Sequence, residues 1–177
     1  MNWNPMPFSN QSVLVTGAGR GIGQATAIKF ACAGASLVLC DIDESSLGET
    51  KALLPAETET LALAMDLTAD QAPQAVMEAA IRRFGRVDVV VNNAGISRAG
   101  VLEDTPEKTL RTVMETNYFG PVLLSKAVLP YMRERRSGHI IMVSSLSGLA
   151  GLPGDFSYTS SKFALEGAAE GMRHEVD

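Results

Sequence analysis

The sequence of 177 residues contains only two cysteines, no excess of positive charge and no long hydrophobic run. The cysteines, Cys32 and Cys40, form neither a metal-ligand spacing nor a disulfide framework, so we expect no metal site. Both lie in apolar surroundings, which predicts buried free thiols in a reducing compartment, namely the cytoplasm. The net charge of -5 argues against nucleic acid as the main partner, because a phosphate backbone requires a basic face.

We also expect neither a targeting segment nor a membrane span. No stretch approaches the roughly 18 apolar residues that a membrane span needs, and the first residues do not resemble a signal peptide. Internal repeats and linkers rich in Pro, Gly or Ser are not evident. The composition therefore predicts one globular domain over residues 9–177, preceded by a flexible lead at residues 1–8.

The pattern that is present is an alternation of short apolar runs with helical stretches. The apolar runs lie at residues 12–17, 36–41, 60–66, 87–95 and 139–145, and the helical stretches at 21–33, 44–54, 70–84 and 106–136. Runs this uniformly apolar predict strands buried on both faces of a parallel sheet. The alternation predicts a doubly wound α/β fold of three layers, in which ligands bind beyond the carboxyl ends of the strands.

A glycine-rich segment, TGAGRGIG at residues 16–23, follows the first apolar run. It is not a P-loop, and Ile22 occupies the third glycine position of the G-x-G-x-x-G fingerprint. It fits G-x-x-x-G-x-G instead, through Gly17, Gly21 and Gly23. Such glycines allow a tight turn, and the helix that follows directs its N–H groups at a diphosphate. The segment predicts dinucleotide binding, with an ordinary turn as the alternative.

Acidic residues end the second and third apolar runs. Asp41 lies eighteen residues after Gly23, where a carboxylate accepts both ribose hydroxyls and repels a 2′-phosphate, which favours NAD over NADP. Arg20 favours NADP, because a guanidinium can pair with a 2′-phosphate, but its side chain has room to turn into solvent. Asp41 is also a candidate N-cap of the next helix. Asp66, followed by Leu67, is placed to reach the adenine or to serve only as a turn or cap residue.

Further motifs accompany the glycine-rich segment. They are NNAG at residues 92–95, Asn117, Ser145, and Tyr158 with Lys162. Their order and spacing resemble the short-chain dehydrogenase/reductase family from about residue 8 to the last residue. The resemblance implies a Rossmann-like oxidoreductase that transfers a hydride between NAD(H) and a secondary alcohol or ketone. It also implies a homodimer or homotetramer that pairs through the long helix from residue 106 and the helix bearing Tyr158.

The resemblance assigns roles to individual residues. It implies that Tyr158 is the acid/base, that Lys162 stabilises its phenolate and holds the nicotinamide ribose, and that Ser145 hydrogen-bonds the substrate oxygen. Ionising a phenol near neutral pH needs about 4 kcal/mol. An ammonium about 4 Å away supplies roughly 1 kcal/mol in water and about 4 in a semi-buried site. The pair therefore requires that water be largely excluded.

Two other assignments have structural alternatives. The resemblance implies a proton-relay water near Asn117, whose carbonyl loses its helical partner because Pro121, four residues later, has no N–H. The alternative is a structural kink. It also implies that Asn93, Ala94 and Gly95 line the adenine-ribose side, although most of their role is expected to be structural.

Rival motifs are weaker. Tyr131 precedes Arg135 by the same four residues as Tyr158 precedes Lys162, and we predict an ordinary surface pair there. The segment GISRAG around Ser97 nearly forms a nucleophile elbow, but Ala99 breaks the pattern and no helix follows directly.

The expected substrate is apolar. Leu146, Leu149 and Leu152 follow Ser145 in the sequence, and SKFALEG at residues 161–167 is similar to the branch that acts on steroid- or retinol-like compounds. The family normally continues beyond "HEVD" with further strands and a substrate lid. We therefore expect a domain without these elements, which leaves an apolar sheet edge. The alternatives are an inactive fragment or a sensor that binds dinucleotide without reacting.

Overall fold

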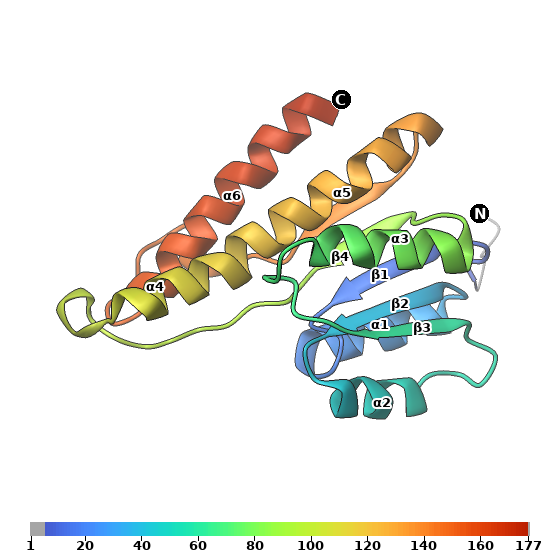
Figure 1. Cartoon of the computed structure of the whole chain (residues 1–177), viewed down its shortest axis with the longest axis horizontal. Helices are drawn as coiled ribbons and strands as arrows, with labels where there is room; N and C mark the ends of the chain where they lie inside the picture. The colour runs from blue at the N-terminus through green and yellow to red at the C-terminus, as the bar shows by residue number, and fades with distance from the viewer. Residues whose placement is uncertain (1–5, 177) are drawn as a thin grey trace.

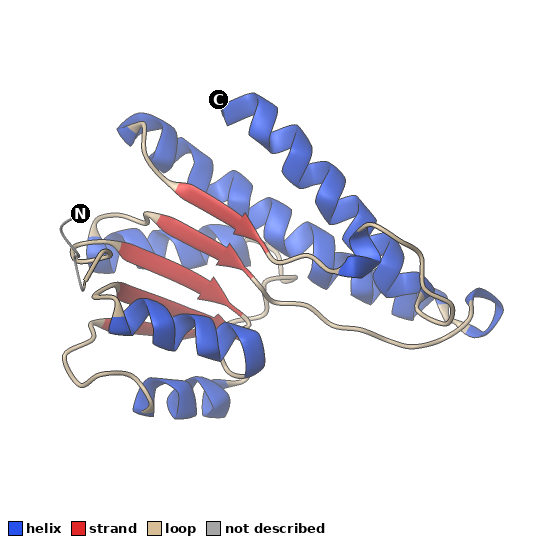
Figure 2. Ribbon diagram, turned by 180° about the vertical axis from the view of Figure 1, so that it is seen from behind, coloured by secondary structure: helices blue, strands red, loops and turns tan. Residues whose placement is uncertain are grey.

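The computed structural model describes residues 6–176 and contains a parallel five-stranded sheet between two layers of helices (Figure 1; Figure 2). The strands are β1 (Ser12–Thr16), β2 (Ser36–Asp41), β3 (Thr60–Ala64), β4 (Val89–Asn92) and β5 (His139–Met142), in the order β3-β2-β1-β4-β5. The helices are α1 (Gly21–Cys32), α2 (Glu44–Ala52), α3 (Ala72–Phe84), α4 (Glu107–Met114), α5 (Gly120–Arg135) and α6 (Phe156–Val176). Short 3₁₀ helices η1 (Leu102–Asp104) and η3 (Leu146–Gly148) lie in the loops. The predicted doubly wound fold is confirmed.

Alternate residues of the central strands bury two separate cores. Val13 and Val15 of β1 face a cluster that includes Ala27 of α1 and Leu47 of α2. Leu14, between them, faces the opposite cluster with residues of α3 and α5. The alternation follows from the pleat of a strand, whose successive side chains point to opposite faces. The apolar residues of β1 thus contribute to both cores, as a sheet between two layers of helices requires.

The prediction of burial on both faces is correct for the central strands and wrong for the edge strands. Every residue of β1 and β4 is buried, whereas β3 and β5 have exposed positions, including Ile141, which is 42% exposed. Beside β5, a groove of about 710 Å³ runs between α5 and α6. The apolar edge expected at the fifth strand is therefore present.

The long helix predicted at residues 106–136 is interrupted in its middle. A π-helical turn, η2 (Glu115–Phe119), separates α4 from α5, and the Gly120 N–H donates to Glu115 O. Pro121 cannot supply the α-helical N–H four residues after Asn117, so a wider turn is the expected response. The structural alternative for this proline, a local distortion of the helix, is therefore observed.

The predicted flexible lead at residues 1–8 is only partly covered by the structure. Residues 1–5 of the predicted lead lie outside the described residues, whereas Phe8 packs edge-to-face on Phe30 at 4.9 Å between ring centroids. The folded part therefore includes Phe8.

The two cysteines differ in burial. Cys32, predicted to be buried, is exposed because it ends α1, while Cys40 in β2 is buried. Burial raises the pKa of the Cys40 thiol to about 12.

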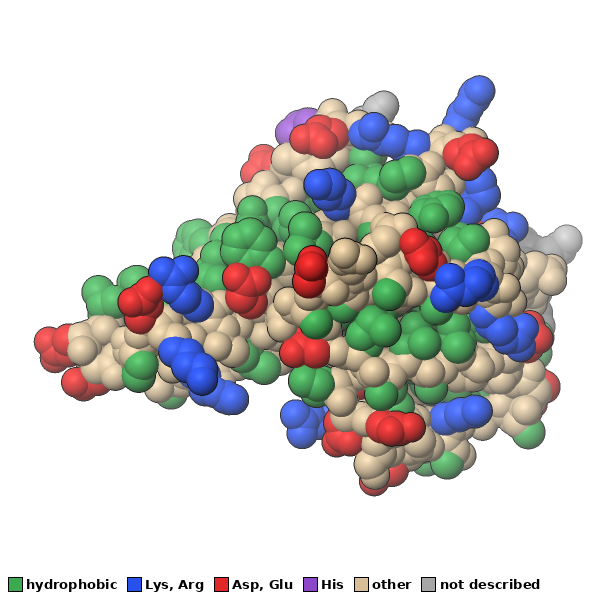
Figure 3. All heavy atoms as spheres, viewed as in Figure 1, with side chains coloured by type: hydrophobic (Ala, Val, Ile, Leu, Met, Phe, Trp, Pro, Cys, Tyr) green, Lys and Arg blue, Asp and Glu red, His purple; other side chains and the backbone are tan. Residues whose placement is uncertain are grey.

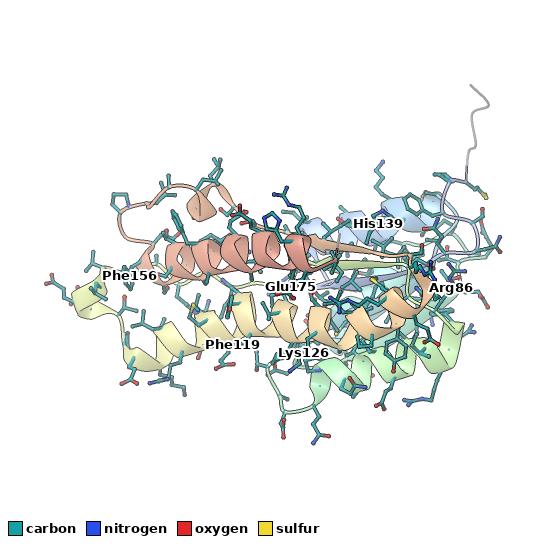
Figure 4. The ribbon with its side chains drawn as sticks, turned by 90° about the horizontal axis from the view of Figure 1, so that it is seen from above. Arg86, Phe119, Lys126, His139, Phe156 and Glu175 are labelled. Atoms are coloured by element: carbon teal, nitrogen blue, oxygen red, sulfur yellow. The ribbon has the colours of Figure 1, made fainter. Side chains whose placement is uncertain are left out.

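A buried carboxylate joins strands and helix at the edge of the sheet opposite to the strand carboxyl ends. Asp88 accepts a hydrogen bond from Ser12 N at 2.9 Å and from Arg86, which lies beside the end of α5 (Figure 4). Arg135 lies 3.7 Å from the same carboxylate and donates to Val87 O. The predicted surface pair of Tyr131 and Arg135 is therefore wrong, because both are half-buried structural residues.

Replacing Asp88 by Ala should lower the free energy of unfolding by about 2 kcal/mol, because the Ser12 N–H and the Arg135 guanidinium lose a buried acceptor. Urea unfolding would measure the loss. The matched control is Glu78→Ala, which removes an exposed ion pair with Arg82 and should cost less than about 0.5 kcal/mol. Equal effects of the two substitutions would contradict a structural role for Asp88.

Candidate active site

The loops after β1, β2, β3 and β4 surround a cavity of about 520 Å³ at the carboxyl ends of the strands. Nine predicted cofactor residues line it: Gly17, Arg20, Ile22, Asp41, Asp66, Leu67, Asn93, Ala94 and Gly95. Residues outside the predicted set also line it, including Thr16 of the glycine-rich segment, Met65, Thr112 and Thr116. Thr112 and Thr116 come from α4 and η2, and their sequence carries no glycine or acidic signal.

The other two predicted glycines shape the loop from outside the cavity lining. Gly21 has φ +58° and no neighbour that a side chain would strike, so its requirement is conformational. A Cβ on Gly23 would lie well inside contact distance of Gly17 O, so its requirement is close packing of backbone on backbone. Gly19 was not predicted, yet a Cβ there would collide with Ser46 Oγ on α2. The spacing pattern alone does not reveal that contact.

Asp41 ends β2 and is bound to the glycine-rich loop. Its Oδ2 accepts from Gly19 N at 2.9 Å and its Oδ1 accepts from Asp43 N at 3.2 Å. The alternative in which Asp41 caps the next helix is wrong, since Asp43 caps α2 by accepting from Ser45 N and Ser46 N. Arg20 is exposed, as expected of a side chain that can turn into solvent.

Asp66 makes the local turn that was one of its two predicted alternatives. Its Oδ1 accepts from Thr68 N at 2.9 Å and from Thr68 Oγ1 at 2.8 Å. The same residue lines the cavity, next to Leu67. Contact of Asp66 with an adenine ring stays a prediction.

The NNAG segment ties β4 to the end of β1. Asn93 N and Ala94 N both donate to Thr16 Oγ1 at 3.0 Å, and Asn93 Nδ2 donates to Thr16 O at 3.0 Å. Asn93 Nδ2 also reaches Gly17 O at 3.3 Å. These bonds hold the first glycine of the loop against the neighbouring strand, which is the structural role expected for most of this segment.

Tyr158 and Lys162 share one face of α6. The Lys162 ammonium is buried, donates to Val143 O at 2.8 Å and lies 5.5 Å from the centre of the Tyr158 ring. Burial lowers the pKa of Lys162, and the Glu166 carboxylate opposes this effect. Lys162 is thus shielded from water, whereas Tyr158 is half-buried.

Asn117 links the cavity to the helix that carries this pair. Its Oδ1 accepts from Ile96 N and its Nδ2 donates to Ile96 O, both at 2.8 Å. Nδ2 also donates to Ser161 Oγ at 3.0 Å, and Ser161 Oγ donates to Tyr158 O at 2.7 Å. Both protons of Nδ2 are therefore engaged, while Oδ1 keeps the capacity to accept one further hydrogen bond.

Ser145 begins η3 and accepts from Ser147 N at 3.1 Å through its hydroxyl oxygen. A hydroxyl that accepts in this way still has its own proton to donate. Its neighbour Ser144 has a buried hydroxyl with no partner within the described residues, packed near Gly148. Both serines are half-buried as residues, but the Ser144 hydroxyl oxygen itself is shielded from solvent.

The buried Lys162 predicts a pH-dependent stability. Its folded pKa lies below the ordinary value of 10.5, so between the two values the unfolded chain binds more protons than the folded one. The free energy of unfolding of the wild type, minus that of Lys162→Met, should therefore increase as the pH rises from neutral toward 10.5. Denaturant unfolding at several pH values measures this difference. The control is Lys29→Met at an exposed position, and a flat or falling difference for Lys162→Met would contradict the burial.

The described residues offer neither a metal centre nor a membrane helix. Among residues 6–176, no group of three or more His, Cys, Asp or Glu side chains could hold a metal ion. Within the same range, none of the helices is both long and apolar enough to cross a membrane.

The fold and the site together define a class of protein, the dinucleotide-binding oxidoreductases. The features that define it are a parallel sheet, a glycine-rich loop before a helix, and a lysine beside a tyrosine.

Comparison with known proteins gives the family directly. Residues 11–177 match the short chain dehydrogenase family, and the chain belongs to it. Dehydrogenase/reductase SDR family member 7B of Bos taurus is 39% identical over 175 residues, covering 95% of this chain and 54% of the relative. The chain thus spans about half the length of the curated relatives it matches.

Solved structures agree with the fold. A short chain dehydrogenase/reductase from Burkholderia phymatum in complex with NAD has a TM-score of 0.92 and 32% identity, covering 95% of this chain and 60% of that one. An NAD+-bound xylitol dehydrogenase has a TM-score of 0.93 and 29% identity, covering 96% of this chain and 66% of that one. These similarities support the Rossmann-like arrangement.

Proposed function

We propose that the protein transfers a hydride between NAD(H) and a secondary alcohol or ketone. The observation that carries the proposal is the buried Lys162 ammonium, held by Val143 O beside the Tyr158 ring. Asn117 joins that pair to Ile96, which lines the cavity at the strand ends. Asn117 therefore links the Tyr158–Lys162 pair to the cavity at the carboxyl ends of the strands, which supports the proposal.

The residues of the chain divide the proton chemistry among them. Bound NAD supplies the carbon that accepts the hydride, or donates it when reduced. Tyr158, as phenolate, takes the proton from the substrate hydroxyl in oxidation and returns a proton to the carbonyl oxygen in reduction. The Lys162 charge stabilises the phenolate, and Ser145 donates its proton to the substrate oxygen. Burial of Lys162 strengthens its charge interaction.

The cavity residues fit a dinucleotide, and NAD better than NADP. The N-terminus of α1 lies at the cavity, because Arg20 and Ile22 line it, and a helix N-terminus offers free N–H groups to a diphosphate. The Asp41 carboxylate in the wall disfavours a 2′-phosphate, while the Arg20 side chain is exposed. Two solved relatives contain NAD, which supports the same choice.

An apolar substrate fits the segment after Ser145. Leu146 is 81% exposed, Leu149 73% and Leu152 51%, which is unusual for three leucines in one short segment. They follow the residue proposed to hold the substrate oxygen, so they would contact the carbon skeleton of the substrate. A steroid- or retinol-like alcohol has the required apolar surface.

We also propose a homodimer or homotetramer that pairs through α4, α5 and α6. Hydrophobic side chains gather over these helices on the face shown in Figure 3. Phe119 of η2, Leu123 of α5 and Phe163 of α6 are each more than a third exposed, and Figure 4 labels Phe119. Multi-angle light scattering would give the mass of the assembly in solution.

The proposal is tested by binding and turnover in two forms of the protein. One is this chain, and the other is extended to the length of its relatives. Both should bind NADH more tightly than NADPH, and the extended form should oxidise apolar secondary alcohols with NAD. Turnover by this chain alone would show that the remaining length is unnecessary. NADH binding by the extended form, with no oxidation across a broad alcohol panel, would indicate a sensor instead.

A further inference from the structure

One buried hydroxyl holds two carbonyls of the glycine-rich loop. Thr50 lies on α2, is fully buried, and its Oγ1 is 2.9 Å from Ala18 O and 3.2 Å from Gly19 O. The Gln24 amide on α1 donates to Thr50 Oγ1 at 2.9 Å and to Gly19 O at 3.3 Å. The hydroxyl oxygen therefore accepts from Gln24, while its single proton is shared by the two carbonyls.

The N–H groups of the same two loop residues are also engaged. Ala18 N donates to Cys40 O at 3.1 Å, and Gly19 N donates to Asp41 Oδ2 at 2.9 Å. All four backbone polar groups of residues 18 and 19 are thus bonded to β2, α1 or α2.

This arrangement leaves a defined set of donors for a ligand. The Gln24 N–H makes the first helical bond of α1, to Arg20 O at 3.3 Å. The N–H groups of residues 21–23 precede it and have no intrahelical acceptor. With residues 18 and 19 held away, these N–H groups are the ones that a diphosphate would meet.

We propose that Thr50, supported by Gln24, is a positioning residue that sets the glycine-rich loop for the diphosphate of the dinucleotide. The inference rests on the proposed NAD binding. A hydroxyl that only satisfied buried carbonyls would affect stability and leave cofactor affinity unchanged. The two roles therefore separate when affinity and stability are measured on the same variants.

The chain offers a closely matched control in Ser125. It is also fully buried, donates to Pro121 O at 2.7 Å and accepts from the Asn92 amide at 3.2 Å. Thr50 and Ser125 therefore make the same kinds of bonds, but only Thr50 bonds the loop. Both Thr50→Val and Ser125→Ala should reduce the apo protein's resistance to urea.

Only the Thr50 change should weaken NADH binding, by about tenfold in Kd, since it removes the hydroxyl that bonds both loop carbonyls and the Gln24 amide. The shift is measured by fluorescence titration of NADH. Thr50→Ser, which restores the hydroxyl, should return Kd to within about threefold of the wild type. ADP affinity should fall with that of NADH, while adenosine affinity should not, because adenosine has no diphosphate.

The possible results separate the two proposals. Equal NADH affinity for Thr50→Val, Ser125→Ala and the wild type would overturn the positioning role and leave NAD binding intact. A wild type that binds no NADH would overturn the proposed function itself. If Thr50→Val does not fold, the NADH Kd of Gln24→Leu, a substitution at a half-exposed position, replaces it as the test. A weaker NADH Kd in that variant supports the positioning unit, and an unchanged Kd overturns it.

Discussion

Replacing Tyr158 by Phe should lower the turnover number by about a thousandfold in a catalytically active form of the protein, because the phenol oxygen is the proposed proton carrier. The ring itself stays, so its contact with the Lys162 ammonium at 5.5 Å from the ring centre is kept. NADH affinity should therefore change by less than about threefold. Steady-state kinetics and NADH titration measure the two quantities separately.

The control for this experiment is Tyr131→Phe. Tyr131 also precedes a basic residue by four positions, but it packs against the core formed by α3, α5 and the sheet. Its replacement should leave turnover within about twofold of the wild type, since no reacting group is removed. If Tyr158→Phe retained wild-type turnover, the assignment of the acid/base would be wrong.

Replacing Gly23 by Ala should abolish measurable NADH binding and lower the free energy of unfolding by about 3 kcal/mol. The added methyl group would strike Gly17 O and the Asn93 amide, which belong to the loop and to the segment that clamps it. A backbone oxygen cannot rotate away as a flexible side chain can. Relief of the clash would therefore distort the loop that receives the diphosphate.

Gly48→Ala is the matched control for that glycine. Gly48 lies inside α2, and a Cβ there meets nothing within 4 Å. Its replacement should raise the free energy of unfolding by about 0.5–1 kcal/mol, because alanine favours helix over glycine, and should leave NADH affinity unchanged. Thermal and urea unfolding give the stabilities. Normal NADH binding by Gly23→Ala would contradict the close-packing requirement.

Local chemistry made much of the site predictable. Asp41, the glycines and the NNAG segment lie at strand ends, where small and polar residues interrupt apolar runs. The four-residue spacing of Tyr158 and Lys162 places them on one helix face whatever the surroundings. The position of Tyr131 and Arg135 near the end of a long helix predicted a surface pair, and this prediction was wrong. The environment of Arg135 depends on Asp88, which lies 47 positions earlier in the chain.

Contacts between distant segments were not predictable in this way. Thr50 lies in no motif, and the motifs that contain Thr16 and Ser161 give no sign of the partners of these hydroxyls, yet each hydroxyl bonds a functional segment from another element. The exposure of β3 and β5 likewise depends on strand order, since a strand at a sheet edge has one neighbour fewer.

The amino-acid sequence by itself determined the alternation of strands and helices, the glycine-rich loop and the spacing of the acid/base pair, because these depend on residues close together in the chain. Only the tertiary structure decided which hydroxyls hold that loop, which strands form the edges and how deeply Lys162 is buried. Burial and hydrogen bonding between distant residues depend on how the layers pack, and packing is a property of the whole folded chain.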